Sequence, residues 1–154
     1  MDRTGGPVTD PGKKFQYDIR ISVRARYLAD QSDPAARIYR HAYTVQITNT
    51  GTIGAQLISR HWIIQGDSDE AQEVRGLGVV GHQPLLKPGQ RFEYTSSSQI
   101  PSATGRMVGS YFFVAEDGTR FDVPIPAFEL TARTDGKDSG ADPEHEPPPG
   151  RTLH

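Results

Sequence analysis

Apolar and polar residues alternate with a period of two along the first part of the chain. Between Tyr17 and Tyr27, and again between Tyr39 and Thr48, every second side chain is mostly apolar and the others are mostly polar or charged. Successive side chains of a β-strand point to opposite faces, so this pattern predicts strands with one buried side. An amphipathic helix needs a period near 3.6 residues, which is absent here. The alternation therefore favours an all-β fold.

Further strand signals follow, separated by short turn sequences. Residues 56–65 are apolar on both faces around Trp62, which is typical of a strand inside a sheet. The remaining runs are 72–75, 91–96, 107–115 and 120–130. Pro124 and Pro126 each remove a backbone donor, so we expect the last strand to be an edge or to be bulged. The only helical signal is a single turn at residues 32–37, with Pro34 near its start.

Seven strands without a longer helix predict an immunoglobulin-like antiparallel β-sandwich with flexible ends. All 13 aromatic residues lie between Phe15 and Phe128. We therefore expect one domain over residues 15–131, with a flexible N-terminal tail over 1–14. Residues 132–154 are acidic and rich in proline, and we expect them to be disordered because they hold few apolar side chains. The acidic residues of this tail account for the net charge of −2.

Composition excludes several classes of function. The 154 residues include no cysteine, which rules out disulfides, thiolate nucleophiles and cysteine-bound zinc. No apolar run approaches the ~20 residues of a membrane span, and the N-terminus lacks a signal-peptide pattern. We therefore expect a cytoplasmic protein without membrane insertion. With 17 basic against 19 acidic residues, a nucleic-acid partner is not expected either.

The sequence also gives no sign of an enzyme. It lacks the G-x-S-x-G pattern of a nucleophile elbow. The hydroxyl groups at residues 59 and 95–98 are not paired in sequence with a base and an orienting acid. We therefore expect no catalytic residues.

Residues 76–81, Gly-Leu-Gly-Val-Val-Gly, match the G-x-G-x-x-G spacing of dinucleotide-binding loops. Such a loop must open a helix, which Pro84 and Pro88 forbid here. Two interpretations stay open. The glycines could serve a strand and bulge where backbones approach closely. Alternatively, a nest of backbone N–H groups could bind phosphate, pyrophosphate or a nucleotide. The residues that would hold such an anion are Arg75, Gly76, Gly78, Gly81 and His82, with Arg60 adding charge.

Two sets of side chains are weak candidates for Mg²⁺ or Co²⁺ ligands. The histidines His41, His61 and His82 are separated by 20 and 21 residues, which fits no ligand motif. A predicted turn carries a cluster of acids, Asp67, Asp69, Glu70 and Glu73, which does not follow the EF-hand pattern. The candidates kept are His61, His82, Asp67 and Asp69. The alternative is a solvated turn and separate histidines, and no cofactor is established.

Arginines at positions 20, 24 and 26 share the polar face of the first predicted strand. They could contact phosphate groups. Such charges more often face solvent or discourage pairing at a sheet edge, and we expect that role here.

Eight segments of the chain together resemble the ApaG family. They are residues 27–32, 42–45, 56–64, 76–84, 87–89, 94–96, 105–111 and 121–130, in order between Phe15 and Leu130. The most characteristic are Gln-Leu-Ile-Ser-Arg-His-Trp-Ile-Ile at 56–64 and Gly-Leu-Gly-Val-Val-Gly-His-Gln-Pro at 76–84. Two positions depart from the family. Leu77 stands where a glutamate is common, which removes any metal role for that carboxylate. His41 stands where an aromatic residue is common.

The resemblance implies an immunoglobulin- or fibronectin-III-like sandwich. It also implies a bacterial cytoplasmic protein linked to cobalt resistance and magnesium efflux, and a domain used for protein–protein interaction without an accepted catalytic activity. We therefore expect a non-enzymatic binding module that acts on an unidentified protein partner. The alternative is a sensor of a phosphate-containing small ligand at residues 76–81. Both a monomer and a homodimer stay open.

Overall fold

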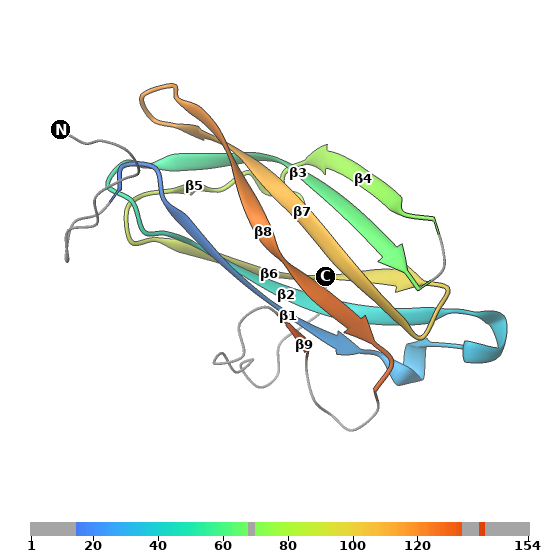
Figure 1. Cartoon of the computed structure of the whole chain (residues 1–154). Coiled ribbons are helices and arrows are strands. Elements are labelled where there is room, and N and C mark those ends of the chain that lie inside the picture. Colours follow the sequence, from blue (N-terminus) through green and yellow to red (C-terminus); the bar gives the residue numbers. More distant parts are fainter. Residues whose placement is uncertain (1–14, 68–69, 134–138, 141–154) are drawn as a thin grey trace, which may run out of the picture.

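The computed structural model describes residues 15–67, 70–133 and 139–140, and its strands form two antiparallel sheets packed face to face (Figure 1). The first sheet has the order β6-β2-β1-β9 and the second sheet the order β4-β3-β7-β8, with β5 beside the start of β3. The first sheet contains β1 (Ile19–Tyr27), β2 (Tyr39–Asn49), β6 (Arg91–Ile100) and β9 (Ser139–Gly140). The second sheet contains β3 (Ala55–Gly66), β4 (Gln72–Leu77), β5 (Leu85–Leu86), β7 (Thr104–Ala115) and β8 (Arg120–Thr131). The predicted β-sandwich is confirmed.

The seven long strands correspond to the seven predicted ones. The largest difference is β6, which continues to Ile100 instead of ending at Ser96. Its polar end, Ser97–Gln99, shows no alternation, but the backbone pairs with β2 as far as Tyr39. The short strands β5 and β9 were not predicted, because two residues carry no periodicity.

Two short 3₁₀ turns, Ala29–Gln31 and Pro34–Ala36, connect β1 to β2. The second is the predicted turn with Pro34 at its start. Among the described residues, no helix is long and apolar enough to cross a membrane.

Only part of the predicted tails can be compared with the structure. Residues 1–14 and most of 132–154 lie outside the described residues. Within the C-terminal tail, β9 pairs antiparallel with β1, so that Arg24 lies opposite Gly140 and Ala25 opposite Ser139.

Trp62 on β3 fills the centre of the core and is 2% exposed. Its ring meets Tyr43 of the first sheet and Tyr111 and Phe128 of the second sheet, with centroids 5.5, 6.3 and 5.9 Å away. All three contacts are edge-on, which is a preferred geometry for aromatic pairs. A Cβ at Gly109 of β7 would lie 2.9 Å from the indole and 2.3 Å from the backbone oxygen of His61. The indole therefore requires a glycine on the neighbouring strand.

The positions of β3 and β8 follow the sequence predictions. β3 lies inside the second sheet, between β4 and β7. β8, which carries Pro124 and Pro126, is an edge strand, and its register with β7 shifts between Met107 and Gly109. The two prolines predicted an edge strand or a bulge, and β8 shows both an edge position and a register shift.

Tyr94 of β6 and Tyr111 of β7 join their hydroxyl groups in a hydrogen bond between the two sheets. Both side chains are buried, at 4% and 0% exposure. Burial raises the pKa of both phenols, so the pair stays neutral over the physiological range. This bond links the two sheets inside the core.

We expect Tyr111→Phe to lower the free energy of unfolding by about 1–3 kcal/mol, because it leaves the buried Tyr94 hydroxyl without its partner. The matched control is Tyr17→Phe, whose hydroxyl bonds the exposed Asp117 and can be replaced by water. Urea unfolding followed by the fluorescence of Trp62, the only tryptophan, measures both variants. Equal losses of unfolding free energy in the two variants would show that the hydrogen bond between Tyr94 and Tyr111 does not stabilise the core.

Candidate functional site

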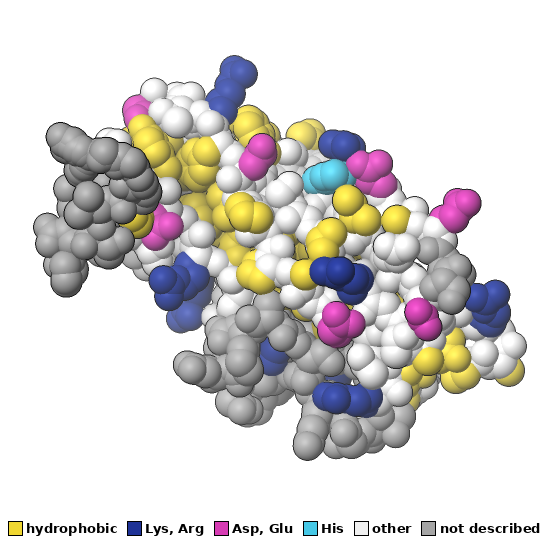
Figure 2. All heavy atoms as spheres, in the orientation of Figure 1, with side chains coloured by type: hydrophobic (Ala, Val, Ile, Leu, Met, Phe, Trp, Pro, Cys, Tyr) yellow, Lys and Arg dark blue, Asp and Glu magenta, His cyan; other side chains and the backbone are white. Residues whose placement is uncertain are grey.

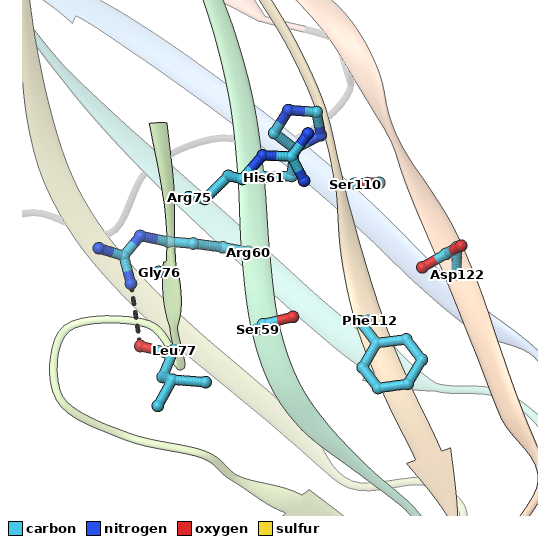
Figure 3. Close-up of a pocket in the computed structure, with 9 residues that line it drawn as sticks. All are labelled: Ser59, Arg60, His61, Arg75, Gly76, Leu77, Ser110, Phe112 and Asp122. Atoms are coloured by element: carbon cyan, nitrogen blue, oxygen red, sulfur yellow. Dashed lines mark hydrogen bonds between the residues drawn. The ribbon is translucent and has the colours of Figure 1, made fainter. Parts of the chain in front are cut away.

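A groove of about 530 Å³ lies on the outer face of the second sheet (Figure 3). It is lined by residues of four strands: Ser59, Arg60, His61, Arg75, Gly76, Leu77, Ser110, Phe112 and Asp122. Trp62 and Tyr111 are core residues. Because side chains alternate across a strand, their sequence neighbours His61, Ser110 and Phe112 face away from the core. The same strands therefore build the core on one side and the groove on the other.

The strand register arranges the groove in two rows that cross the sheet. In the first row, Ser59 pairs with both Leu77 and Phe112, and Phe112 pairs with Asp122. In the second row, His61 pairs with both Arg75 and Ser110. The first row contains two apolar side chains, Leu77 and Phe112, on either side of Ser59, and Leu77 is 74% exposed. The second row is polar, so a ligand meets an apolar strip bordered by charge.

A small charged network forms the β4 side of the groove. Nε2 of His61 lies 2.6 Å from Oε2 of Glu73, and Arg75 donates to the same oxygen at 2.8 Å. The hydrogen bond from His61, followed by the charge and hydrogen bond of Arg75, holds the pKa of the Glu73 carboxyl below its ordinary value. Glu73 therefore remains ionised and orients the side chains of His61 and Arg75 on the rim.

Arg60 supports the loop that follows β4. Its guanidinium passes over Gly76, and Nη1 donates to the backbone oxygens of Leu77 at 3.0 Å and Gly78 at 2.9 Å (Figure 3 shows the first bond). A Cβ at Gly76 would lie 2.7 Å from the guanidinium. Gly76 thus provides the space that Arg60 needs, and the arginine holds two loop carbonyl groups.

The glycine loop is closed by its own backbone. The N–H of Gly78 donates to Ile58, while Val79 and His82 exchange both of their backbone hydrogen bonds, at 2.8 to 2.9 Å. Gly78 and Gly81 have φ angles of 65° and 82°, and a Cβ at Gly78 would lie 2.4 Å from the His82 oxygen. This is a tight backbone approach of the kind that glycine permits. An anion would have to displace these bonds or use the other N–H groups of the loop.

The structure separates the residues predicted to hold an anion. Arg60, Arg75 and Gly76 line the groove. Gly78 and Gly81 form the turn that follows β4, and the ring of His82 packs against Phe92, with centroids 5.7 Å apart. The predicted set is therefore divided between the groove and the loop.

The metal candidates are not brought together either. His61 lies in the groove with Glu73, His82 lies beside Phe92, and His41 is buried in the core at 1% exposure. Asp67 follows β3, where its N–H bonds Ser102 and Thr104, and Asp69 lies outside the described residues. No group of three potential ligands occurs among the residues that the structure describes. The donor set there does not fit a Co²⁺ or Mg²⁺ site.

Sequence reasoning missed Phe112, Ser110 and Asp122 as groove residues. A signal for Phe112 exists in the chain. Phe112 and Phe113 are consecutive in a strand, so one of the two rings must point away from the core. Phe113 is fully buried, and Phe112 is the ring that faces the groove.

We expect Gly78→Ala to destabilise the protein more than Gly81→Ala. Both residues have left-handed backbone angles, which cost a residue with a Cβ about 1–2 kcal/mol. Only at Gly78 does the added Cβ also meet a backbone oxygen, whereas nothing lies within 4 Å at Gly81. Urea unfolding of both variants measures the difference. Equal stabilities would show that the close approach at Gly78 is not a constraint.

We expect both His61→Ala and Arg75→Ala to raise the pKa of Glu73 toward its ordinary value of 4.5, because the His61 hydrogen bond, followed by the charge and hydrogen bond of Arg75, lowers it. A carboxyl whose pKa is lowered by folding stabilises the native state above its ordinary pKa. This contribution is lost as the pH falls through the lowered value. A pH titration of the Glu73 carboxyl carbon by NMR measures the shift. An unchanged midpoint in His61→Ala would contradict the network.

Comparison with known proteins agrees with this fold. The model of the ApaG domain family matches residues 29–115. Protein ApaG of Nitrosomonas eutropha is 60% identical over 116 residues, covering 75% of this chain and 91% of that protein. Protein ApaG of Acidovorax sp. is 49% identical over 141 residues, covering 92% and 98%.

A solved structure adds to this comparison. The crystal structure of the putative ApaA protein from Bordetella pertussis has a TM-score of 0.75 and 54% sequence identity to this chain. The match covers 77% of this chain and 97% of the Bordetella pertussis chain. The chain belongs to the ApaG domain family.

Proposed function

We propose that this protein is a non-enzymatic binding module of the cytoplasm that serves Co²⁺ and Mg²⁺ homeostasis by contacting another protein through the groove on the second sheet. The observation that carries this proposal is the exposed apolar surface in the first row of the groove. Leu77 on the edge strand β4 exposes 74% of its surface, and Phe112 lies in the same row on the other side of Ser59. Contact of apolar side chains with water is unfavourable. Exposed apolar surface with a polar rim is typical of interaction sites.

The groove also indicates the chemistry of the partner. Figure 2 shows exposed apolar side chains among charged ones on the face that is turned toward the reader. Arg75 lies at the β4 side of the groove and Asp122 at the β8 side, in different rows and separated across the sheet by three strand spacings, or ~14 Å. A complementary segment places an apolar side chain on Leu77 and Phe112. It carries an acidic group toward Arg75 and a basic group toward Asp122.

The groove supports binding better than catalysis. Its hydroxyl groups belong to Ser59 and Ser110, and its only imidazole, His61, engages Glu73 through Nε2. The groove lies open on a sheet face, whereas catalytic sites usually exclude water. Since the described residues offer no fitting set of metal ligands, a role in Co²⁺ or Mg²⁺ homeostasis would operate through the partner.

The second candidate is a sensor of phosphate, pyrophosphate or a nucleotide at residues 76–81. The N–H groups of Gly78, Val79 and the following His82 already donate to backbone oxygens, and the Arg60 guanidinium donates to two loop carbonyl groups. A phosphate would compete with these bonds. We therefore place the protein contact first.

The test is complementation of a strain that lacks this gene, grown in the presence of Co²⁺ and at limiting and excess Mg²⁺. We expect Leu77→Lys to fail to restore growth, because it replaces the exposed apolar surface of the groove with a charge of the sign opposite to the family's common glutamate. Leu85→Lys is the matched control. It adds the same charge to a leucine that is 46% exposed and does not line the groove, and it should restore growth.

Folding of both variants is checked by the fluorescence of the buried Trp62. Growth restored equally by both variants would contradict the groove as the contact site. A deletion strain that grows normally under all these conditions would contradict the role in metal homeostasis.

A further inference from the structure

β4 is an edge strand that extends beyond the covered core. It ends the second sheet, and no strand among the described residues pairs with it on the side away from β3. Every residue of β4 is exposed except Gly76, which is half-buried. Val74 pairs with the core residue Trp62 and therefore faces the first sheet, yet it is 36% exposed. The open edge of β4 is thus accessible to another strand.

The backbone groups of β4 alternate between β3 and the open edge. The N–H of Gly78, directly after β4, donates to Ile58, and this bond sets the phase of the antiparallel ladder. In that phase the N–H and C=O groups of Val74 face β3. Those of its two neighbours, Glu73 and Arg75, therefore face the open edge. Edge groups of this kind are a template for pairing with another chain.

The sequence of β4 is complementary to itself when two copies run antiparallel. If Val74 lies opposite Val74 of a second copy, Glu73 of each chain lies opposite Arg75 of the other. Their backbone groups face the edge, so each such pair can also exchange two backbone hydrogen bonds. Registers centred on Glu73 or on Arg75 would instead place like charges opposite each other, which is destabilising. Charge therefore selects the register centred on Val74.

The other edge strand on this side, β6, is a poorer match for a second copy. Arg91 and Glu93 of β6 are also two residues apart, but β6 begins at Arg91. Self-pairing there would span residues 91–93 alone, whereas pairing through β4 spans residues 72–76. The Glu93 carboxylate is also half-buried and accepts a hydrogen bond from β2. Both charged side chains at the centre of β4 are exposed, at 53% and 70%.

We propose that two copies of this chain associate through β4, antiparallel and in register about Val74, and join their second sheets into one continuous sheet. The occupant of the β4 edge is thus a second copy of the chain. A two-fold axis perpendicular to the sheet relates the copies, so both grooves open on the same side. The inference goes beyond the proposed function, which concerns the outer face of the second sheet and not its edge.

The test measures the association of the full chain by analytical ultracentrifugation over a range of concentrations. Glu73→Lys and Arg75→Glu each place two pairs of like charges across the contact. Each should raise the dissociation constant of the dimer by about tenfold or more. An equimolar mixture of the two variants should recover the dimer, because it places opposite charges in both pairs again.

The matched control is Arg91→Glu, which reverses an exposed arginine of the other edge strand and should leave the dissociation constant unchanged. The fluorescence of the buried Trp62 reports whether each variant is folded. A parent chain that stays monomeric at millimolar concentration would overturn the proposal. So would a mixture of folded variants that does not associate, or a control that weakens the dimer.

A second measurement needs no variant. Amide NMR signals of residues 72–76 in the parent chain should shift with protein concentration, and those of residues 120–131 in β8 should not. Concentration-dependent shifts confined to β6 or β8 would overturn pairing through β4. Leu77→Lys retains Glu73 and Arg75, and association is measured on the isolated protein. The complementation test of the proposed function therefore succeeds or fails separately.

Discussion

The packing of Trp62 determines how the two sheets meet. Its ring touches Tyr43 of the first sheet and Tyr111 and Phe128 of the second sheet, all edge-on. Gly109 allows this placement because any larger residue would collide with the indole and with the backbone of β3. The contact fixes β3 and β7 beside each other at the middle of the second sheet. Every groove residue on these strands takes its position from that arrangement.

The core and the groove are two faces of the same strands. His61 precedes Trp62 and Ser110 precedes Tyr111, so the residues that anchor the core also orient the outward ones. The Glu73 network and the Arg60 contacts then join β4 and its loop to β3. A rigid backbone with an apolar row on its surface is suited to recognition of a protein segment, since little ordering is needed on binding.

The sequence alone predicted the sandwich, because alternation, turn residues and the two prolines of β8 act locally. It also placed Trp62 inside a central strand. The end of β6 was missed because its serines carry no alternation, and their pairing depends on β2. Two residues of β9 are too few for any periodic signal.

The site was harder to predict than the fold. The glycine spacing predicted a possible ligand site at residues 76–81. The groove instead depends on which residues of four strands share a row. Phe112 and Asp122 are far from Arg75 in the sequence and meet it only through the strand register. Likewise, the sequence pattern predicts a solvated Arg24, whereas Arg24 is buried in the structure at the position where β9 pairs with β1. Register across strands is a property of the folded chain that a single sequence pattern does not carry.

The two lateral sides of the sandwich differ in a way that limits self-assembly. On one side, β8 carries Pro124 and Pro126, and β9 already pairs with part of β1. Both features obstruct the addition of another strand. On the other side, β4 and β6 are the edge strands, and neither contains proline. Growth of a filament by edge pairing needs two receptive sides on each molecule. Among the described residues, the side formed by β4 and β6 is therefore the more receptive of the two to pairing with another strand.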